Sequence, residues 1–293
     1  MPVQTGTARC VVECGNTLGE GCVWDPRDAS LYWTDIEESR VYRLGSEGDT
    51  TVFEMPERVA FILPRREPGF VIGFASRIAI ADANLHSFVT LTSIEAELPQ
   101  TRVNDAAVDP AGGVVFGTFD ERDRQPVASL YRLAPDGALT RLLDGITISN
   151  GIAFSPDRRT MYFADTPVGL IRRFQVEADC RAFQEVDPLA GGDIAPGAPD
   201  GAVVDAEGGY WSARVWGGCL VKIDGAGRLA ERIDLPTKGP TCVALGGPNL
   251  AHLFATTLRV RQSDAELQAA PQAGGLFTTK VAVAGQVQRL ALL

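Results

Sequence analysis

The sequence predicts an all-β chain folded as a six-bladed β-propeller, and three observations support this fold class. Tight turns rich in Asp, Pro and Gly recur along the chain, and each is followed by short strands rich in Val, Ile, Phe, Tyr and Thr. No apolar pattern of helical period extends beyond two turns. The turns begin at positions 25, 63, 109, 155, 205 and 246, so they are 38 to 50 residues apart and about 44 on average. That period is typical of a four-stranded blade, and six turns predict six blades.

Two strands are expected after each turn. The first is apolar with an aromatic residue near its centre, and the second ends in an aromatic–basic or aliphatic pair. The clearest copies are residues 31–35 with 41–44, 114–118 with 129–133, 161–165 with 170–174, and 210–213 with 219–223. Weaker copies occupy residues 69–74 and 252–256, after the second and sixth turns. Each unit therefore contributes strands to one blade.

A propeller must also close, and the two ends of the chain supply candidate strands. Residues 8–14 precede the first turn and have the composition of a strand. We expect them to form an outer strand of the last blade, beside residues 275–279 and the terminal residues 288–292, because this pairing removes exposed sheet edges. No linker or shift of composition divides the chain, so a single propeller domain is predicted over residues 1–293.

Composition limits the partners of this chain. Its net charge of −10 repels phosphate backbones and anionic lipid, so neither nucleic acid nor a membrane surface is an expected partner. The N-terminus lacks the basic and apolar regions of a signal peptide, so we expect the protein in the cytoplasm. We also expect it to be a monomer. The six cysteines form no CxxC pair and have no histidine at zinc-ligand spacing, so free thiols are predicted at positions 10, 14, 22, 180, 219 and 242.

Four polar residues lie five positions before four of the turns, namely Glu20, Asn104, Asn150 and Asp200. Any one of them is explained by turn chemistry, because Asn-Gly and Asp-Gly are common turn dipeptides. Four in one register are more specific, since equivalent points of a ring of repeats converge on one axis. Glycine follows three of them and allows the backbones to approach closely where several chains crowd. Two carboxylates and two carboxamides on an axis predict a site for a divalent cation.

These residues belong to motifs that also indicate a family. The sequence resembles the SMP-30 (senescence-marker-protein, or regucalcin)/gluconolactonase family of six-bladed propellers, which includes bacterial sugar-acid lactonases. The motifs are LGEG (18–21), RVND (102–105), DP (109–110), GT (117–118), ISNG (148–151), SPD (155–157), PDG (199–201), GGP (246–248) and AGGLF (273–277). The resemblance implies hydrolysis of an aldonolactone in carbohydrate catabolism.

The resemblance also implies roles for single residues. Glu20, Asn150 and Asp200 occupy the positions that ligate a single divalent metal. Arg102 and Asn104 occupy positions that bind the sugar. Glu121 is a further candidate for substrate binding, although the chain departs from its relatives here, with Phe119 where they often carry Met and an acidic loop that is hard to align.

We expect one divalent metal ion as the cofactor. An all-oxygen donor set suits Ca²⁺, Mg²⁺ or Mn²⁺ better than structural zinc, and catalytic Zn²⁺ and Fe²⁺ are the alternatives. Such an ion can polarise the carbonyl of a sugar lactone, the expected small-molecule partner. Asp200 is the best candidate to take a proton from the attacking water, and a metal-bound hydroxide is the competing account. The rival functions are hydrolysis of another ester, such as an organophosphate or aryl ester, and a non-catalytic calcium-binding or interaction propeller.

Other residues give weaker indications of function. No G-x-S-x-G elbow accompanies His86 or His252, so a Ser–His–Asp hydrolase is poorly supported. His252 is expected to be structural, and His86 is a weak candidate for the mouth. Trp211 is expected in a blade core and Trp216 either there or against a sugar face. Asp35 and Asp165 are expected to cap turns, and substrate choice is expected in residues 74–100 and 120–126.

Overall fold

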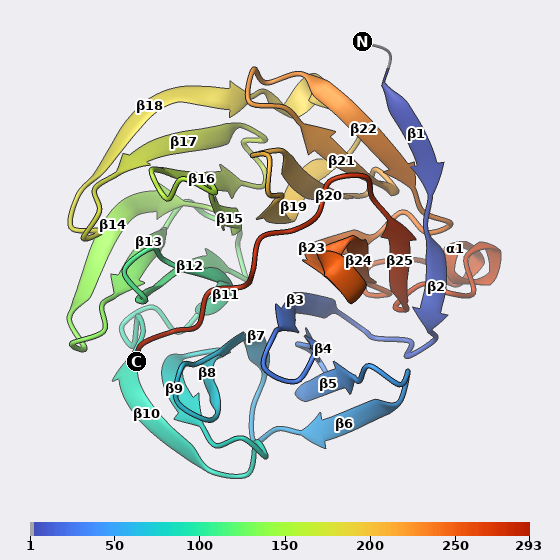
Figure 1. Ribbon diagram of the computed structural model, residues 1–293. Helices are drawn as coiled ribbons and strands as arrows, with labels where there is room; N and C mark the ends of the chain where they lie inside the picture. The colour runs from blue at the N-terminus through green and yellow to red at the C-terminus, as the bar shows by residue number, and fades with distance from the viewer. Residues whose placement is uncertain (1–2) are drawn as a thin grey trace.

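The computed structural model of the protein describes residues 3–293 and arranges six β-sheets around a common axis (Figure 1). Five sheets have four strands and one has five, and within each blade consecutive strands are antiparallel neighbours. The predicted all-β six-bladed propeller is therefore confirmed. Each recurring turn joins the innermost strand of a blade to the next strand, which is where the repeat placed it.

The strands of the six blades follow one order from the axis outward. The innermost strands are β3 (Gly19–Asp25), β7 (Val59–Pro64), β11 (Thr101–Val108), β15 (Ser149–Phe154), β19 (Ala198–Val204) and β23 (Pro240–Gly246). The second strands are β4 (Ser30–Asp35), β8 (Phe70–Phe74), β12 (Val114–Asp120), β16 (Thr160–Asp165), β20 (Tyr210–Val215) and β24 (His252–Thr257). The third strands are β5 (Arg40–Leu44), β9 (Arg77–Ala81), β13 (Ala128–Leu133), β17 (Ile171–Val176), β21 (Cys219–Ile223) and β25 (Leu276–Lys280). The outer strands are β6 (Thr50–Glu54), β10 (Phe88–Ser93), β14 (Leu139–Ile146), β18 (Phe183–Ala190), β22 (Leu229–Asp234) and, from the N-terminus, β2 (Arg9–Val12).

The N-terminal segment closes the ring. Strand β2 pairs antiparallel with β25 as the outer strand of the sixth blade, which confirms the prediction for residues 8–14. Strand β1 (Gln4–Thr7) continues into the fifth blade and pairs parallel with β22, a contact that the sequence did not suggest. One short segment thus covers the outer edges of two neighbouring blades, and this coverage removes edges open to pairing with other chains.

The prediction for residues 288–292 was wrong. The outer position beside β25 is already taken by β2, and the terminal residues instead run across one end of the axis (Figure 1). The backbone N–H of Ala291 donates to the carbonyl oxygen of Pro64 at 2.9 Å, and that of Leu292 donates to Gly112 at 2.8 Å. These acceptors lie in the second and third blades, so the tail joins blades across the ring.

Large side chains fill the space between the blades. Trp33, Phe116, Phe163 and Trp211, the aromatic residues at the centres of the second strands, are fully buried. Burying each such side chain contributes on the order of 2–3 kcal/mol. The expectation that Trp211 belongs to a blade core is confirmed, and the six cysteines are free thiols, as predicted.

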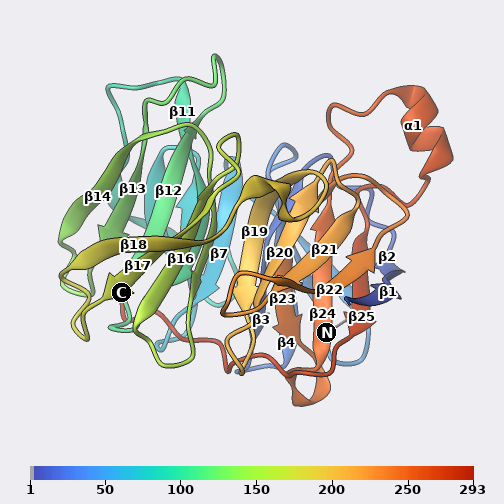
Figure 2. The same cartoon turned by 90° about the horizontal axis from the view of Figure 1, so that it is seen from above.

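Within residues 3–293 helical structure is confined to short segments: α1 (Asp264–Ala269), η1 (Gly192–Ile194) and η2 (Pro248–Leu250). Helix α1 lies on the side of the ring opposite the C-terminal tail (Figure 2). Among the described residues no helix is both long enough and apolar enough to cross a membrane.

Candidate active site on the propeller axis

A β-bulge interrupts the pairing near the start of every inner strand. In β3, for example, Glu20 pairs with Thr34 and Val23 with Tyr32, so two residues of β3 lie opposite one residue of β4. The same slip occurs in the other five inner strands. A bulge bends a strand and redirects side chains. The four polar residues singled out from the repeat lie in these bulges or directly before them.

Glycine is required at two of these bulges. Gly21 has a φ of 52° and Gly151 a φ of 64°, in the left-handed region that residues with a Cβ adopt only at a cost. A Cβ on Gly21 would lie 2.7 Å from the carbonyl oxygen of Ala60 in the next blade, which is too close for any side chain. The expected crowding of chains around the axis is therefore observed, and it explains why glycine follows Glu20 and Asn150.

The predicted site residues line one cavity of about 180 Å³ at the end of the axis where the inner strands begin. The side that carries α1 holds this opening, which we call the mouth. Its lining includes all six residues predicted to bind metal or substrate: Glu20, Arg102, Asn104, Glu121, Asn150 and Asp200. Four of them are deeply buried, with exposed fractions of 8% for Asn104, 6% for Asp200, 5% for Arg102 and 4% for Asn150. Sequence positions up to 180 residues apart are thus brought to one small volume.

The pKa values of the two carboxylates predicted to bind metal, Glu20 and Asp200, are both raised. Burial and then the charge of Asp105 raise the pKa of Glu20 to about 8. Burial, followed by the charges of Glu20 and Asp105, raises the pKa of Asp200 well above its usual range. Neither Glu20 nor Asp200 forms an ion pair with any residue of the described chain. Carboxylates whose pKa values are raised by burial and by neighbouring carboxylates are arranged unfavourably unless a cation or a proton lies beside them.

The donor set fits a divalent ion, with one qualification. In the described part of the chain no three His, Cys, Asp or Glu side chains gather into a metal cage. An ion at the mouth would therefore use the two carboxylates together with the carboxamide oxygen of Asn150. Oxygen donors of this kind suit hard cations, and three protein ligands leave positions for water or substrate.

Hydrogen bonds fix the carboxamides. The Nδ2 group of Asn150 donates to Thr166 Oγ1 at 2.8 Å, and the Thr166 hydroxyl donates to the carbonyl oxygen of Pro199 at 2.9 Å. The Nδ2 group of Asn104 donates to Asn150 Oδ1 at 3.1 Å. The amide orientation of Asn150 is therefore set from both sides, and its oxygen, which has two lone pairs, is directed away from Thr166. Because Pro199 precedes Asp200, the same contacts join both candidate ligands.

Arg102 continues this network toward the edge of the mouth. Its guanidinium donates to Asn104 Oδ1 at 2.6 Å and to Glu121 Oε1 at 3.0 Å. Glu121 also accepts from both terminal nitrogens of Arg58, at 2.8 and 2.7 Å. The guanidinium of Arg102 lies 4.6 Å from the centre of the Phe119 ring. Phe119, the departure from the family pattern, is thus the surface on which Arg102 rests.

Several expectations about neighbouring residues need correction. Residues 74–100 were expected over the mouth, yet none of the described residues that line the cavity comes from that segment. His86 lies in the turn after β9, exposed and outside the cavity, and Asp82 accepts from its backbone N–H. The other expected segment, residues 120–126, does line the cavity, through Glu121 and Arg124. Further parts of the wall come from loops that follow β20 and β24, through Trp216, Val260 and Arg261. Loop position depends on ring geometry, which a single sequence does not reveal.

The structure agrees with the expectations for Trp216, Asp35 and Asp165. Trp216 is 42% exposed and lines the cavity, so of its two expected places the mouth is observed. Asp35 accepts from the backbone N–H groups of Thr17 and Leu18, and Asp165 caps residues 147–148 in the same way.

Asp105 is the residue that sequence reasoning missed. It occupies the bulge of β11 beside Asn104, accepts from the backbone N–H of Ile152 at 2.8 Å, and burial raises its pKa to about 7. Its position in the RVND motif was noted, but strand alternation would direct it away from Asn104. The bulge removes that alternation. The sequence feature that could have identified Asp105 is its place directly after Asn104, one of the four polar residues five positions before a turn.

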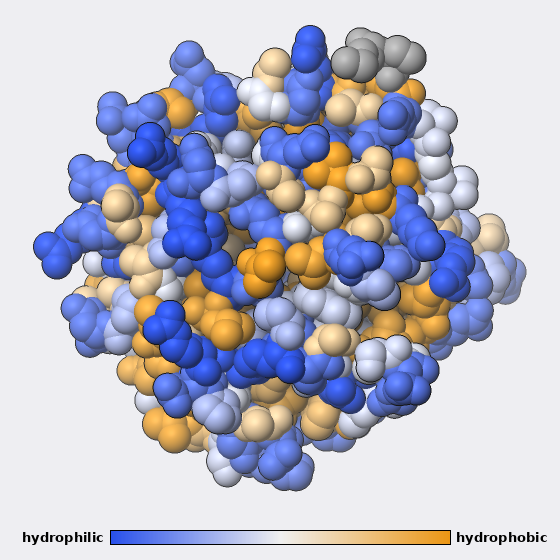
Figure 3. All heavy atoms as spheres, viewed as in Figure 1, coloured by the Kyte–Doolittle hydropathy of each residue, from blue (hydrophilic) through white to orange (hydrophobic). Residues whose placement is uncertain are grey.

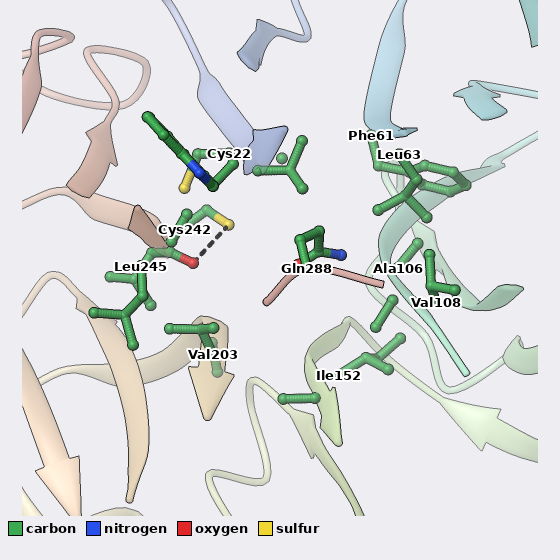
Figure 4. A pocket seen from close by; sticks show the side chains of 18 of the residues that line it. Cys22, Phe61, Leu63, Ala106, Val108, Ile152, Val203, Cys242, Leu245 and Gln288 are labelled. Atoms are coloured by element: carbon green, nitrogen blue, oxygen red, sulfur yellow. Dashed lines mark hydrogen bonds between the residues drawn. The ribbon is translucent and has the colours of Figure 1, made fainter. Parts of the chain in front are cut away.

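A second cavity of about 110 Å³ lies farther along the axis. All six inner strands line it, mostly with apolar side chains, which surround Gln288 of the C-terminal tail (Figure 4). The amide of Gln286 donates to the carbonyl oxygens of Phe154 and Val204, at 3.1 and 3.0 Å. In the space-filling view of the face that carries the C-terminal tail, side chains cover the centre of the ring (Figure 3). The axis is therefore open at the mouth and covered by the tail at its far end.

Comparison with known proteins agrees with this geometry. Residues 18–259 match the family described as SMP-30/Gluconolactonase/LRE-like region. An L-arabinolactonase of Azospirillum brasilense is 39% identical over 289 residues, which cover 96% of this chain and 94% of the relative. A 6-deoxy-6-sulfogluconolactonase of Pseudomonas putida is 35% identical, over 97% of this chain and 98% of the relative. Among solved structures, the calcium-binding protein regucalcin from Agrobacterium tumefaciens superposes with a TM-score of 0.93 at 29% identity and covers 99% of both chains.

Proposed function

The chain belongs to the SMP-30/gluconolactonase/LRE-like family, and on that premise we propose that it hydrolyses a sugar-acid lactone to the free acid with one divalent ion at the mouth. Relatives named for hydrolysis of sugar lactones align over nearly the full length of both chains, so this protein is a lactone-hydrolysing enzyme. One of these relatives is named for a pentonolactone and the other for a sulfonated hexonolactone, which leaves the sugar of this enzyme to be determined. The reaction would serve carbohydrate catabolism.

The main support for an ion is that two carboxylates, Glu20 and Asp200, share this cavity and neither forms an ion pair with a described residue. Glu20, Asn150 and Asp200 would hold it. When bound, a divalent ion would polarise the lactone carbonyl and stabilise the negative charge that develops on its oxygen.

Asp200 is assigned the proton transfer. Its carboxylate is buried at the cavity wall, beside the position proposed for the ion. A carboxylate within reach of the attacking water can accept its proton in the transition state. That water adds to the carbonyl carbon as Asp200 accepts its proton, the ring C–O bond breaks, and the ring oxygen takes the proton back from Asp200 and becomes a hydroxyl group.

Arg102 and Asn104 are assigned to the sugar. Arg102 is buried, rests on the Phe119 ring, and is held through Glu121 by Arg58. A guanidinium fixed in this way presents its remaining N–H groups in one direction and can bind sugar hydroxyls at a small cost in entropy. Glu121 borders the cavity and could accept a bond from a sugar hydroxyl, but its closest partners are the two arginines.

The test is a panel of pentono- and hexonolactones assayed by acid release after chelation and reloading with Ca²⁺, Mg²⁺, Mn²⁺, Zn²⁺ or Fe²⁺. We expect chelation to abolish hydrolysis and at least one ion to restore it. Glu20→Gln should lose the restored activity, whereas Glu47→Gln, an exposed carboxylate on an outer turn, should keep it. Full activity of Glu20→Gln would refute the site assignment.

Calcium binding beside hydrolysis is the second candidate role, because the structural relative is a calcium-binding protein. It predicts that Ca²⁺ raises the melting temperature whether or not Ca²⁺ is the ion that supports hydrolysis. Calcium is for the same reason the first ion to test.

A further inference from the structure

Two arginines at the mouth, Arg124 and Arg261, form neither an ion pair nor a side-chain hydrogen bond with any described residue. We propose that they bind a second anionic group on the substrate, so that the preferred lactone carries a carboxylate or sulfonate at the end remote from its reacting carbonyl. This inference rests on the proposed lactonase function and names the substrate class of the same site.

The charges that line the mouth support it. Once a divalent ion is bound, the carboxylates of Glu20 and Asp200 are balanced. Glu37 and Glu121 are matched by Arg58 and Arg102, since Arg58 lies 3.8 Å from Glu37 and 2.7 Å from Glu121, and Arg102 lies 3.0 Å from Glu121.

Asp105, whose charge acts on Glu20 and Asp200, offsets part of the charge of the two unmatched arginines, and a positive local charge remains on a chain whose net charge is −10. This positive charge would attract an anionic lactone to the mouth. A neutral lactone could form hydrogen bonds with the arginines but would gain no attraction between opposite charges.

Arg124 stands close to the predicted sugar position. Its guanidinium lies 6.0 Å from the centre of the Phe119 ring, and the guanidinium of Arg102 lies 4.6 Å from the same centre. One aromatic ring thus lies near both cations, the inner one matched by Glu121 and the outer one unmatched. A substrate whose hydroxyls contact Arg102 would extend its far end toward Arg124.

Three residues at the mouth have a left-handed backbone. Arg124, Trp216 and Arg261 have φ values of 50°, 65° and 63°. Residues with a Cβ pay roughly 1 kcal/mol or more for this conformation, whereas glycine adopts it readily. Non-glycine residues in other turns of the chain share it, so it describes the tight turns that hold these three side chains at the mouth and does not itself identify a ligand.

The wall beside Arg261 is anchored. The Trp216 ring lies 5.2 Å from the ammonium group of Lys238, and Lys238 forms an ion pair with Glu266 of α1. Lys238 is therefore matched and adds no free charge, which leaves Arg261 as the unmatched cation on that side. The two arginines come from separate loops, so the substrate would lie between them.

The experiment compares D-glucaro-1,4-lactone with D-glucono-1,4-lactone, which differ only in a carboxylate or a hydroxymethyl group at C6, using ion-loaded protein. We expect wild type to prefer the charged lactone in kcat/KM. The ratio of the two kcat/KM values should fall about tenfold in the double variant Arg124→Gln/Arg261→Gln. Raising NaCl from about 0.05 M to about 0.5 M should lower the ratio in wild type and leave it nearly constant in the variant. A lactone with a C6 sulfonate forms a further arm, and a preference confined to one anion identifies which group the arginines bind.

The matched control is Arg122→Gln/Arg259→Gln. It makes the same charge change two residues away in the same two loops, at exposed positions outside the cavity lining. Its ratio should stay within about twofold of wild type. A ratio near one in wild type, or one that both double variants lower equally, overturns the inference and leaves the lactonase intact. Hydrolysis of neither lactone, nor of the wider panel, would remove the proposed function and this inference with it.

Discussion

The two ends of the propeller axis are built from the same six strands and differ in almost every other respect. At the mouth, where the inner strands begin, buried polar and charged residues face one cavity and form a continuous hydrogen-bond network. At the far end, where those strands finish, the lining is mostly apolar and the C-terminal tail covers it (Figure 4). Neighbouring residues of one strand belong to different linings: in β11, Asn104 lines the mouth and Asp105 lines the far cavity.

The two ends of the axis therefore have different roles: the mouth binds, and the far end stabilises the ring. Bulges at the mouth give up regular pairing and leave carboxylates that disfavour the empty site, which is acceptable where an ion or substrate supplies the missing interaction. The far end satisfies its own groups with tail contacts. We therefore expect changes at the mouth to reduce activity at constant stability, and changes at the far end to do the opposite.

The largest effect is expected from Asp200→Asn, which removes the assigned base and one metal ligand. The kcat for lactone hydrolysis should fall at least about 10³-fold, while circular dichroism shows an unchanged fold. With chelator present the variant should melt at a higher temperature than wild type, because the repulsion between Asp200 and Glu20 is gone. Asp187→Asn, at an exposed outer position, is the control and should match wild type. Activity within tenfold of wild type would show that Asp200 is not the base.

Deleting residues 286–293 should give the next largest effect, on stability. Backbone and side-chain hydrogen bonds to four blades are lost, and the free energy of unfolding in urea should fall by about 2–4 kcal/mol. Hydrolysis per folded molecule should stay within twofold at 25 °C. Gln286→Ala alone should cost about 1–2 kcal/mol, whereas Gln288→Ala, whose amide contacts only Arg289 at 3.4 Å, should cost less. A large loss of activity at unchanged stability would reverse the comparison.

A smaller effect is expected from Arg102→Lys. Lysine keeps the charge but cannot contact Glu121 and Asn104 together or rest flat on Phe119, so KM should rise about tenfold, or about 1.4 kcal/mol. Steady-state kinetics measures this, with Arg122→Lys in the exposed loop as control. An unchanged KM would remove Arg102 from substrate binding.

The smallest effect is expected from Thr166→Val, which leaves the Asn150 amide without its partner. Less than about 1 kcal/mol is at stake, so kcat/KM should fall about threefold and the affinity for the ion should fall to a similar degree. Thr166→Ser keeps the hydroxyl and should restore both values. If serine fails where valine fails, the methyl group rather than the hydrogen bond is important.

Much of the fold could be predicted because the repeat is local. Each turn, each aromatic second strand and each polar residue before a turn is visible within one unit of the sequence, and closure of a ring then brings the units to one axis. The ring-closing strand at residues 8–14 was also predictable, since its composition is that of a strand and the last blade needed one. The prediction for residues 288–292 failed because the free edge of β25 can pair with only one strand, and the N-terminal strand β2 occupies it.

The sequence by itself determined the six-bladed architecture and the convergence of Glu20, Asn150 and Asp200, because both depend on a spacing that chain geometry repeats. Tertiary structure alone decided what cannot be read from spacing: the bulge that turns Asp105 toward the axis, the loop that brings Arg261 to the mouth, and the path of the tail. The physical reason is that a repeat fixes the positions of equivalent residues, whereas contacts between non-equivalent segments depend on the space left once the ring has closed.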